Sequence, residues 1–87
     1  MARIDLSGAS EMAQTTTIDE TLFQLGIDAS TGRDSEPDLI SAHKWFNLAA
    51  SRGNDEAKRY RTELSREMSR ADIARAQRLA REWITTH

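Results

Sequence analysis

The chain has 87 residues, a formal net charge of −2 and no cysteine. A chain of this length forms at most one small domain, close to the size at which a hydrophobic core only just suffices. Without cysteine there is no disulfide and no thiolate metal site, which fits a reducing, cytoplasmic setting. The first twenty residues hold no long apolar run, so we expect neither a signal peptide nor a membrane span there.

The net charge hides an asymmetry between the two halves of the chain. Residues 1–43 carry two basic and eight acidic side chains, whereas residues 44–87 carry ten basic and six acidic ones. Charge divided in this way can steer an oriented association with a partner. Helical surfaces also carry charge without such a role, so the asymmetry leaves both interpretations open.

Residues 1–16 are expected to form a flexible amino-terminal arm, because after Met1 they hold only Ile4, Leu6 and Met12 as large apolar residues. A helical domain is expected over residues 17–87. Thr17 and Glu20 have the spacing of a capping box, which predicts that a first helix begins near Ile18.

The expected first helix has apolar residues on two faces. One set recurs at the spacing of a single helix face and predicts a core stripe: Ile18, Leu22, Leu25 and Ala29. Phe23 and Ile27 lie together on nearly the opposite side. Burial of each would contribute about 1.5–3 kcal/mol, so something should cover them. The candidates are the amino-terminal arm, a partner protein and a second copy of the chain.

The second helix is expected to follow a turn over residues 32–37. Pro37 favours a helix start at its own position or just after it, with Asp38 or Ser35 as the cap. The helix should run to about Arg52. Its apolar residues cover an unusually broad face, which suits a helix held by the first and third helices: Leu39, Ala42, Trp45, Phe46, Leu48, Ala49 and Ala50.

Two further helices are expected in the second half. Asn54 or Asp55 can cap a third helix that ends near Glu67, and Ser69 can cap a fourth that ends near Ile84. The third helix has a narrow apolar stripe, and the fourth has a wider one: Ala57, Tyr60, Leu64 and Met68, then Ile73, Ala76, Leu79, Ala80, Trp83 and Ile84. We expect these two helices to form a second hairpin.

The stretch from Leu25 to Ala57 carries small and aromatic residues at fixed spacing: Leu25, Gly26, Gly32, Asp38, Ala42, Trp45, Phe46, Ala49, Ala50, Gly53 and Ala57. This pattern resembles the Sel-one-like repeat, a tetratricopeptide-like helical hairpin, and residues 73–83 resemble the terminal helix of such proteins. The resemblance implies an all-α fold of about four helices, arranged as two antiparallel hairpins in a right-handed stack. It corresponds to one full repeat followed by a degenerate capping hairpin. Gly26 is expected to allow close helix approach, and Gly32 and Gly53 to end helices at positive φ.

Few residues of the chain suit catalysis, metal binding or cofactor binding. His43 and His87 are the only histidines, and His43 is expected on the polar, solvent-facing side of the second helix. Residues 34–38 have the acidic spacing of a calcium loop, but Leu39 and Trp45 stand where that loop requires Gly and Glu. The scattered glycines do not form a phosphate-binding loop. We therefore expect no enzyme activity, no metal and no cofactor.

Two surfaces are candidates for partner binding. The first is the pair Phe23 and Ile27. The second is a basic face of the expected fourth helix: Arg70, Arg75, Arg78 and Arg81. This basic face can be ordinary solvated surface, or it can meet an acidic protein or a nucleic acid. The acidic overall charge and the lack of aromatic residues among the arginines speak against nucleic acid.

The resemblance implies a non-catalytic protein–protein interaction module. Such a module would act as an adaptor, accessory subunit or regulator in a cytoplasmic assembly, without contact to a membrane, and self-association is a further way to cover its surfaces. A structural small subunit of a large enzyme complex is an alternative. A nucleic-acid-associated protein that uses the basic helix face is a third, less favoured interpretation.

Overall fold

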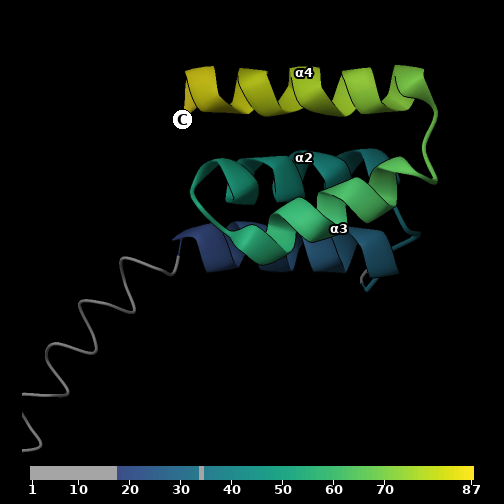
Figure 1. The fold of residues 1–87 in the computed structure, drawn as a ribbon, viewed down its shortest axis with the longest axis horizontal. Coiled ribbons are helices and arrows are strands. Elements are labelled where there is room, and N and C mark those ends of the chain that lie inside the picture. Colours follow the sequence, from purple (N-terminus) through teal and green to yellow (C-terminus); the bar gives the residue numbers. More distant parts are fainter. Residues whose placement is uncertain (1–17, 34) are drawn as a thin grey trace, which may run out of the picture.

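A computed structural model describes residues 18–33 and 35–87 of the chain. Within these ranges the protein is all-helical, with four helices and no strand (Figure 1). They are a first helix over residues 18–31, α2 (Leu39–Ser51), α3 (Asp55–Ser65) and α4 (Arg70–Thr86). The expected all-α fold is confirmed. The expected amino-terminal arm over residues 1–16 and the cap at Thr17 lie outside the described residues.

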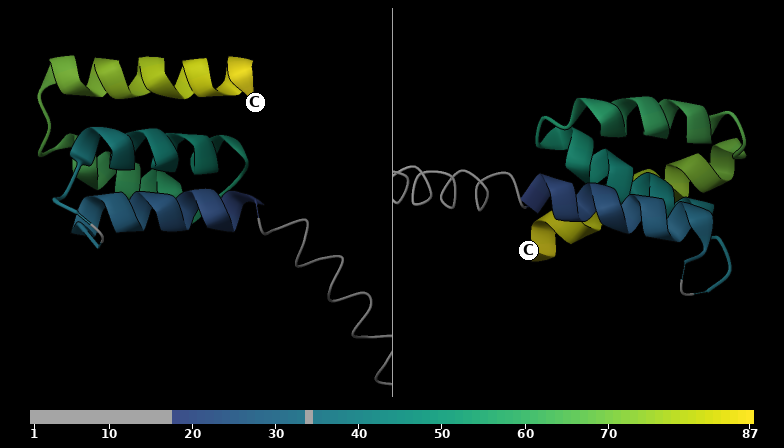
Figure 2. Two further views of the ribbon diagram at one scale, coloured as in Figure 1. Left: turned by 180° about the vertical axis from the view of Figure 1, so that it is seen from behind. Right: turned by 90° about the horizontal axis from the view of Figure 1, so that it is seen from below.

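The central element is α2, against which α3 and α4 both pack. Figures 1 and 2 show α2 between the first helix and α4, with α3 on a further side. The first helix and α4 run in opposite directions along α2 (Figure 1). A short turn over residues 66–69 joins α3 to α4, and both of these helices pack more extensively on α2 than on each other. The broad apolar face of α2 is thus explained by neighbours on three sides.

Side-chain caps begin α2, α3 and α4, as the sequence predicts. The Asp38 carboxylate accepts hydrogen bonds from the backbone N–H of Ser41 at 3.0 Å and from its hydroxyl at 2.9 Å. These hydrogen bonds, the one from the backbone first, lower the pKa of Asp38. Asn54 accepts from the backbone N–H of Ala57 at 2.9 Å, and Ser69 accepts from that of Asp72 at 3.1 Å. Asp38 is therefore the cap of α2, and Asn54 that of α3.

Small residues bring the helices of the core close together. The hydrophobic core consists of one cluster of buried side chains: Leu22, Ala42, Phe46, Leu48, Ala49, Ala50, Ala57, Leu64 and Ala80. A Cβ placed on Gly26 would lie 2.5 Å from Cε1 of Phe46, so Gly26 does allow the close approach expected of it. Gly32 and Gly53 have φ values of 71° and 97°, which confirms the expected left-handed helix ends.

The two apolar faces of the first helix are used differently from the prediction. Phe23 and Ile27 pack against the core, and the Phe23 ring lies 5.6 Å from that of Phe46 and 5.2 Å from that of Tyr60. The expected core stripe is thus not the only face that packs: Phe23 and Ile27 pack against the core while remaining partly exposed. Their expected role in partner binding stays a prediction. Within the predicted core stripe, Leu22 is buried but Ile18 is 51% exposed and Leu25 is 38% exposed. The helix packs on α2 and α3 with a face rotated from the predicted one.

No helix among the described residues is both long and apolar enough to cross a membrane.

Candidate functional site

An apolar groove lies along α2 between the first helix and α4. Its volume is about 290 Å³. Residues of the first helix supply most of the lining, and one tryptophan each comes from α2 and α4: Ile18, Thr21, Leu22, Leu25, Trp45 and Trp83. Thr21 is the only polar residue of this set. The groove therefore collects the apolar side chains that the folded chain leaves partly exposed.

Two tryptophans form the part of the groove contributed by α2 and α4. The rings of Trp45 and Trp83 meet edge to face, with centroids 6.1 Å apart and an interplanar angle of 80°. The Lys44 ammonium lies 4.0 Å from the centroid of the Trp45 ring, and the His87 ring stacks on Trp83 at 4.5 Å. Trp45 was expected to fill the core, but it is only partly buried and packs at the core's edge. Its indole is held in place by these contacts and remains accessible from the groove.

The predicted basic face is present on α4. Arg70, Arg75, Arg78 and Arg81 are all exposed, and none of them takes part in the ion pairs that the described residues form with one another. Arg75 also contributes, after the hydrogen bonds from Ser41, to lowering the pKa of Asp38. The arginines do not line the groove, and Phe23 and Ile27 pack against the core.

A second, polar pocket of about 430 Å³ lies between α2, α3 and α4. Its lining residues come from all three helices: His43, Asn47, Arg61, Thr62, Ser65, Ile73 and Gln77. His43 is only 1% exposed, so the prediction of a surface histidine is wrong. The error arises because α2 is covered by α3 and α4 on the side that its polar residues occupy. Asn47 follows His43 by one helical turn and so lies on the same side of α2. This spacing could have indicated that α2 also packs through a polar face.

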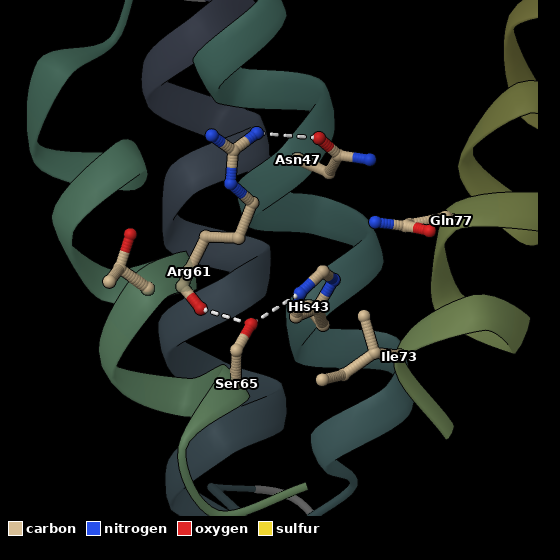
Figure 3. A pocket seen from close by; sticks show the side chains of 7 residues that line it. His43, Asn47, Arg61, Ser65, Ile73 and Gln77 are labelled. Carbon is tan, nitrogen blue, oxygen red and sulfur yellow. Dashed lines mark hydrogen bonds between the residues drawn. The ribbon is translucent and has the colours of Figure 1, made fainter. Parts of the chain in front are cut away.

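A hydrogen bond joins the His43 ring of α2 to Ser65 of α3. The Ser65 hydroxyl donates to the carbonyl oxygen of Arg61 at 2.9 Å, so its single proton is used there. The hydroxyl oxygen lies 3.0 Å from Nε2 of His43 (Figure 3). With the Ser65 proton on the Arg61 carbonyl, this oxygen is placed to accept from Nε2, which corresponds to the Nε2–H tautomer with a lone pair on Nδ1. Nδ1 is buried without a hydrogen-bond partner among the described residues.

The histidine–serine pair lies between α2 and α3, and the Ser65 hydroxyl has the Arg61 carbonyl as a second partner at 2.9 Å. Burial, and secondarily the charge of Arg61, lower the pKa of His43. The pair is thus a neutral contact between α2 and α3.

Arg61 brings a cation to the polar pocket. Its Nη1 donates to Oδ1 of Asn47 at 2.7 Å, which leaves the Asn47 amide NH₂ available as a donor. Arg61 does not take part in the ion pairs formed among the described residues. Figure 3 shows Arg61, Asn47 and Gln77 around the upper part of the pocket, with His43 below them. No group of three or more potential metal-binding side chains occurs in the described ranges.

No protein-family model matches the chain, and no curated protein or solved structure matches it either. The resemblance to the Sel-one-like repeat therefore rests on the residues of the chain itself.

Proposed function

We propose that the protein is a non-catalytic interaction module whose apolar groove binds the apolar face of an amphipathic helix from another, acidic protein. The observation that carries this proposal is the groove between the first helix and α4, with Trp45 and Trp83 on one side and Ile18 and Leu25 on the other. In this role the chain would serve as an adaptor, accessory subunit or regulator.

The groove favours an apolar occupant. Ile18 and Leu25 are 51% and 38% exposed, although a chain of this size has few large apolar residues to build a core with. Complete burial of such a side chain contributes about 1.5–3 kcal/mol. A partner that covers both would therefore gain free energy that the chain alone does not, and large aromatic side chains beside them are typical of strongly contributing contacts.

The shape of the groove favours a helix as the occupant. The first helix and α4 run in opposite directions along α2 (Figure 1), and the groove between them is lined by residues from all three. A helix laid in such a groove contacts helices on both sides, and its apolar residues at i, i+3 and i+4 provide the anchors.

The charge of α4 and its surroundings favours an acidic partner. Four arginines of α4 are exposed, and the Lys44 ammonium lies over the Trp45 ring beside the groove. An acidic residue of a bound helix would meet the Lys44 ammonium beside the groove, while the exposed arginines of α4 lie outside the groove lining. Such complementarity speeds association and selects the partner more than it adds affinity.

The test compares two substitutions of equal chemistry at two exposed apolar sites. Leu25 lines the groove, whereas Ile84 is 56% exposed on α4 and does not line it. Leu25→Asp and Ile84→Asp are prepared beside the unaltered chain, and partners retained from extract of the source cells are identified, purified and titrated by calorimetry. We expect Leu25→Asp to weaken binding at least about tenfold and Ile84→Asp to leave it unchanged. Equal affinity of both variants for the partner would overturn the proposal.

Two further outcomes would assign the groove or the arginines differently. Sedimentation of the purified chain that shows a dimer lost in Leu25→Asp would make a second copy the occupant. Binding of nucleic acid that weakens steeply with salt and depends on Arg78 would point to the basic face instead. Either result, without a helical protein partner, would contradict the proposal.

A further inference from the structure

We propose that the polar pocket between α2, α3 and α4 is a second binding site, which takes a carboxylate group on the guanidinium of Arg61. This pocket shares no residue with the apolar groove, so the inference goes beyond the proposed function and does not depend on it.

Arg61 carries a positive charge at the polar pocket. Its side chain is half-buried at the pocket and donates to Asn47, but no carboxylate of the described residues forms an ion pair with it. A guanidinium has five N–H donors in a planar fork, and a carboxylate matches that fork with two parallel hydrogen bonds. A bound carboxylate would balance a charge that the described part of the chain leaves unbalanced.

His43 brings to the lining of the same pocket a buried ring nitrogen that is unpartnered among the described residues. Nδ1 of this almost fully buried ring has no hydrogen-bond partner, and such groups are rare in folded proteins. In Figure 3 the ring lies between Ser65 on one side and Ile73 and Gln77 on the other. After burial, the charge of Arg61 helps to lower the pKa of His43, so a carboxylate bound to Arg61 would offset that charge and favour the protonated ring.

The remaining polar groups select a carboxylate over a larger anion. The amides of Asn47 and Gln77 line the pocket and can each donate a hydrogen bond to an oxygen, whereas the Thr62 hydroxyl donates to the Lys58 carbonyl at 2.9 Å. Arg61 is the only permanent cation among the lining residues. One cation suits a singly charged group better than a phosphate dianion. The carboxylate can belong to a small molecule or to a peptide, and both share this chemistry.

The test follows the pocket side chains directly by NMR of the full chain labelled with ¹⁵N. The Arg61 Nε–H and the side-chain amides of Asn47 and Gln77 are observed during titration with sodium acetate, with sodium chloride at equal ionic strength as the control. We expect saturable shifts with acetate alone. We also expect the pKa of His43, followed through its ring protons, to rise when acetate is bound.

Matched variants show whether acetate binding depends on Arg61 itself or only on the positive charge of α3. Arg61→Gln should weaken acetate binding at least about tenfold. Arg59→Gln makes the same change at an exposed residue of α3, which pairs with Glu56 at 3.6 Å, and should leave binding unchanged. Arg61→Lys keeps the charge without the fork, and it serves if the glutamine variant does not fold. It should bind several-fold more weakly than the unaltered chain.

Peptides distinguish the two sources of the carboxylate. A peptide with a free carboxyl terminus that binds more tightly than acetate and than its amidated form indicates a peptide ligand, whereas equal affinity for acetate and peptide indicates a small molecule. Both results support the carboxylate site. The proposal is overturned by shifts that match those in chloride, by an equal loss in Arg59→Gln, by phosphate binding as tight as acetate binding, or by an unmoved pKa of His43.

Discussion

The ring of Phe46 occupies the space that a side chain at residue 26 would need. A Cβ on Gly26 would lie 2.5 Å from Cε1 and 2.6 Å from Cδ1 of this ring. Phe46 is only 1% exposed, and its ring also contacts those of Phe23 and Tyr60. It therefore has little room to move away. This contact sets how closely the first helix approaches α2.

Gly26→Ala should destabilise the protein even though alanine is the better helix former. Helix propensity favours alanine by about 1 kcal/mol, but overpacking a well-filled core costs about 1–3 kcal/mol. We expect a net loss, visible as a lower midpoint of thermal unfolding by circular dichroism. The double variant with Phe46→Leu should lose less stability than the sum of the losses measured for the two single variants. A Gly26→Ala variant more stable than the unaltered chain would show that the contact is not tight.

The stability of the fold should fall in mildly acidic solution because of His43. Its pKa is lowered in the folded state by burial and by Arg61, whereas the unfolded chain binds the proton near a pH of about 6.5. The stabilising contribution is therefore complete above that pH and is lost as the pH falls toward the lowered value. Urea unfolding at a series of pH values measures it. His43→Gln should remove this dependence and His87→Gln should keep it, and the reverse pattern would contradict the assignment.

Asn54 should contribute to stability in two separable ways. Its Oδ1 caps α3, and its Nδ2 donates to Asp19 of the first helix at 3.3 Å. Asn54→Ala loses both contacts and should cost about 1–2 kcal/mol. Asn54→Asp keeps the cap but places a second carboxylate beside Asp19. We expect a smaller loss of stability, which should disappear at low pH because the repulsion between the two carboxylates is then removed. Chemical unfolding of both variants tests this, and equal losses at every pH would argue against the contact with Asp19.

Phe23→Asp should lower the stability of the folded protein. Because Phe23 packs against Phe46 and Tyr60, a carboxylate there is buried among aromatic rings. Phe23→Ala alone should cost about 2–3 kcal/mol, less than the loss for a fully buried phenylalanine, and Phe23→Asp should cost more. Thermal unfolding measures both. A Phe23→Asp chain that stays as stable as the unaltered one but loses its partner would restore Phe23 as a docking residue.

The sequence predicts the helices well and their neighbours less well. The caps Asp38, Asn54 and Ser69 act through contacts three residues away, so local sequence is enough to find them. Periodicity shows that Phe23 and Ile27 share one face, but it does not show which face the other helices cover. That choice depends on contacts between distant segments, as between Gly26 and Phe46.

The two sites illustrate the same limit. The groove needs Trp45 and Trp83, which are far apart in the chain and meet only because α4 lies along α2. His43 has polar neighbours in sequence and so is predicted at the surface. Its burial follows from the packing of α3 and α4 on α2, and its partner Ser65 comes from α3.

The central claim is that a partner helix lies against Trp45 and Trp83. These are the two tryptophans of the chain, and both line the groove. The most direct measurement is therefore the tryptophan emission during titration with the purified partner, whose own tryptophans are replaced by phenylalanine. The account predicts a saturable blue shift, absent in Leu25→Asp and retained in Ile84→Asp. Binding confirmed by calorimetry that leaves the emission unchanged would contradict it.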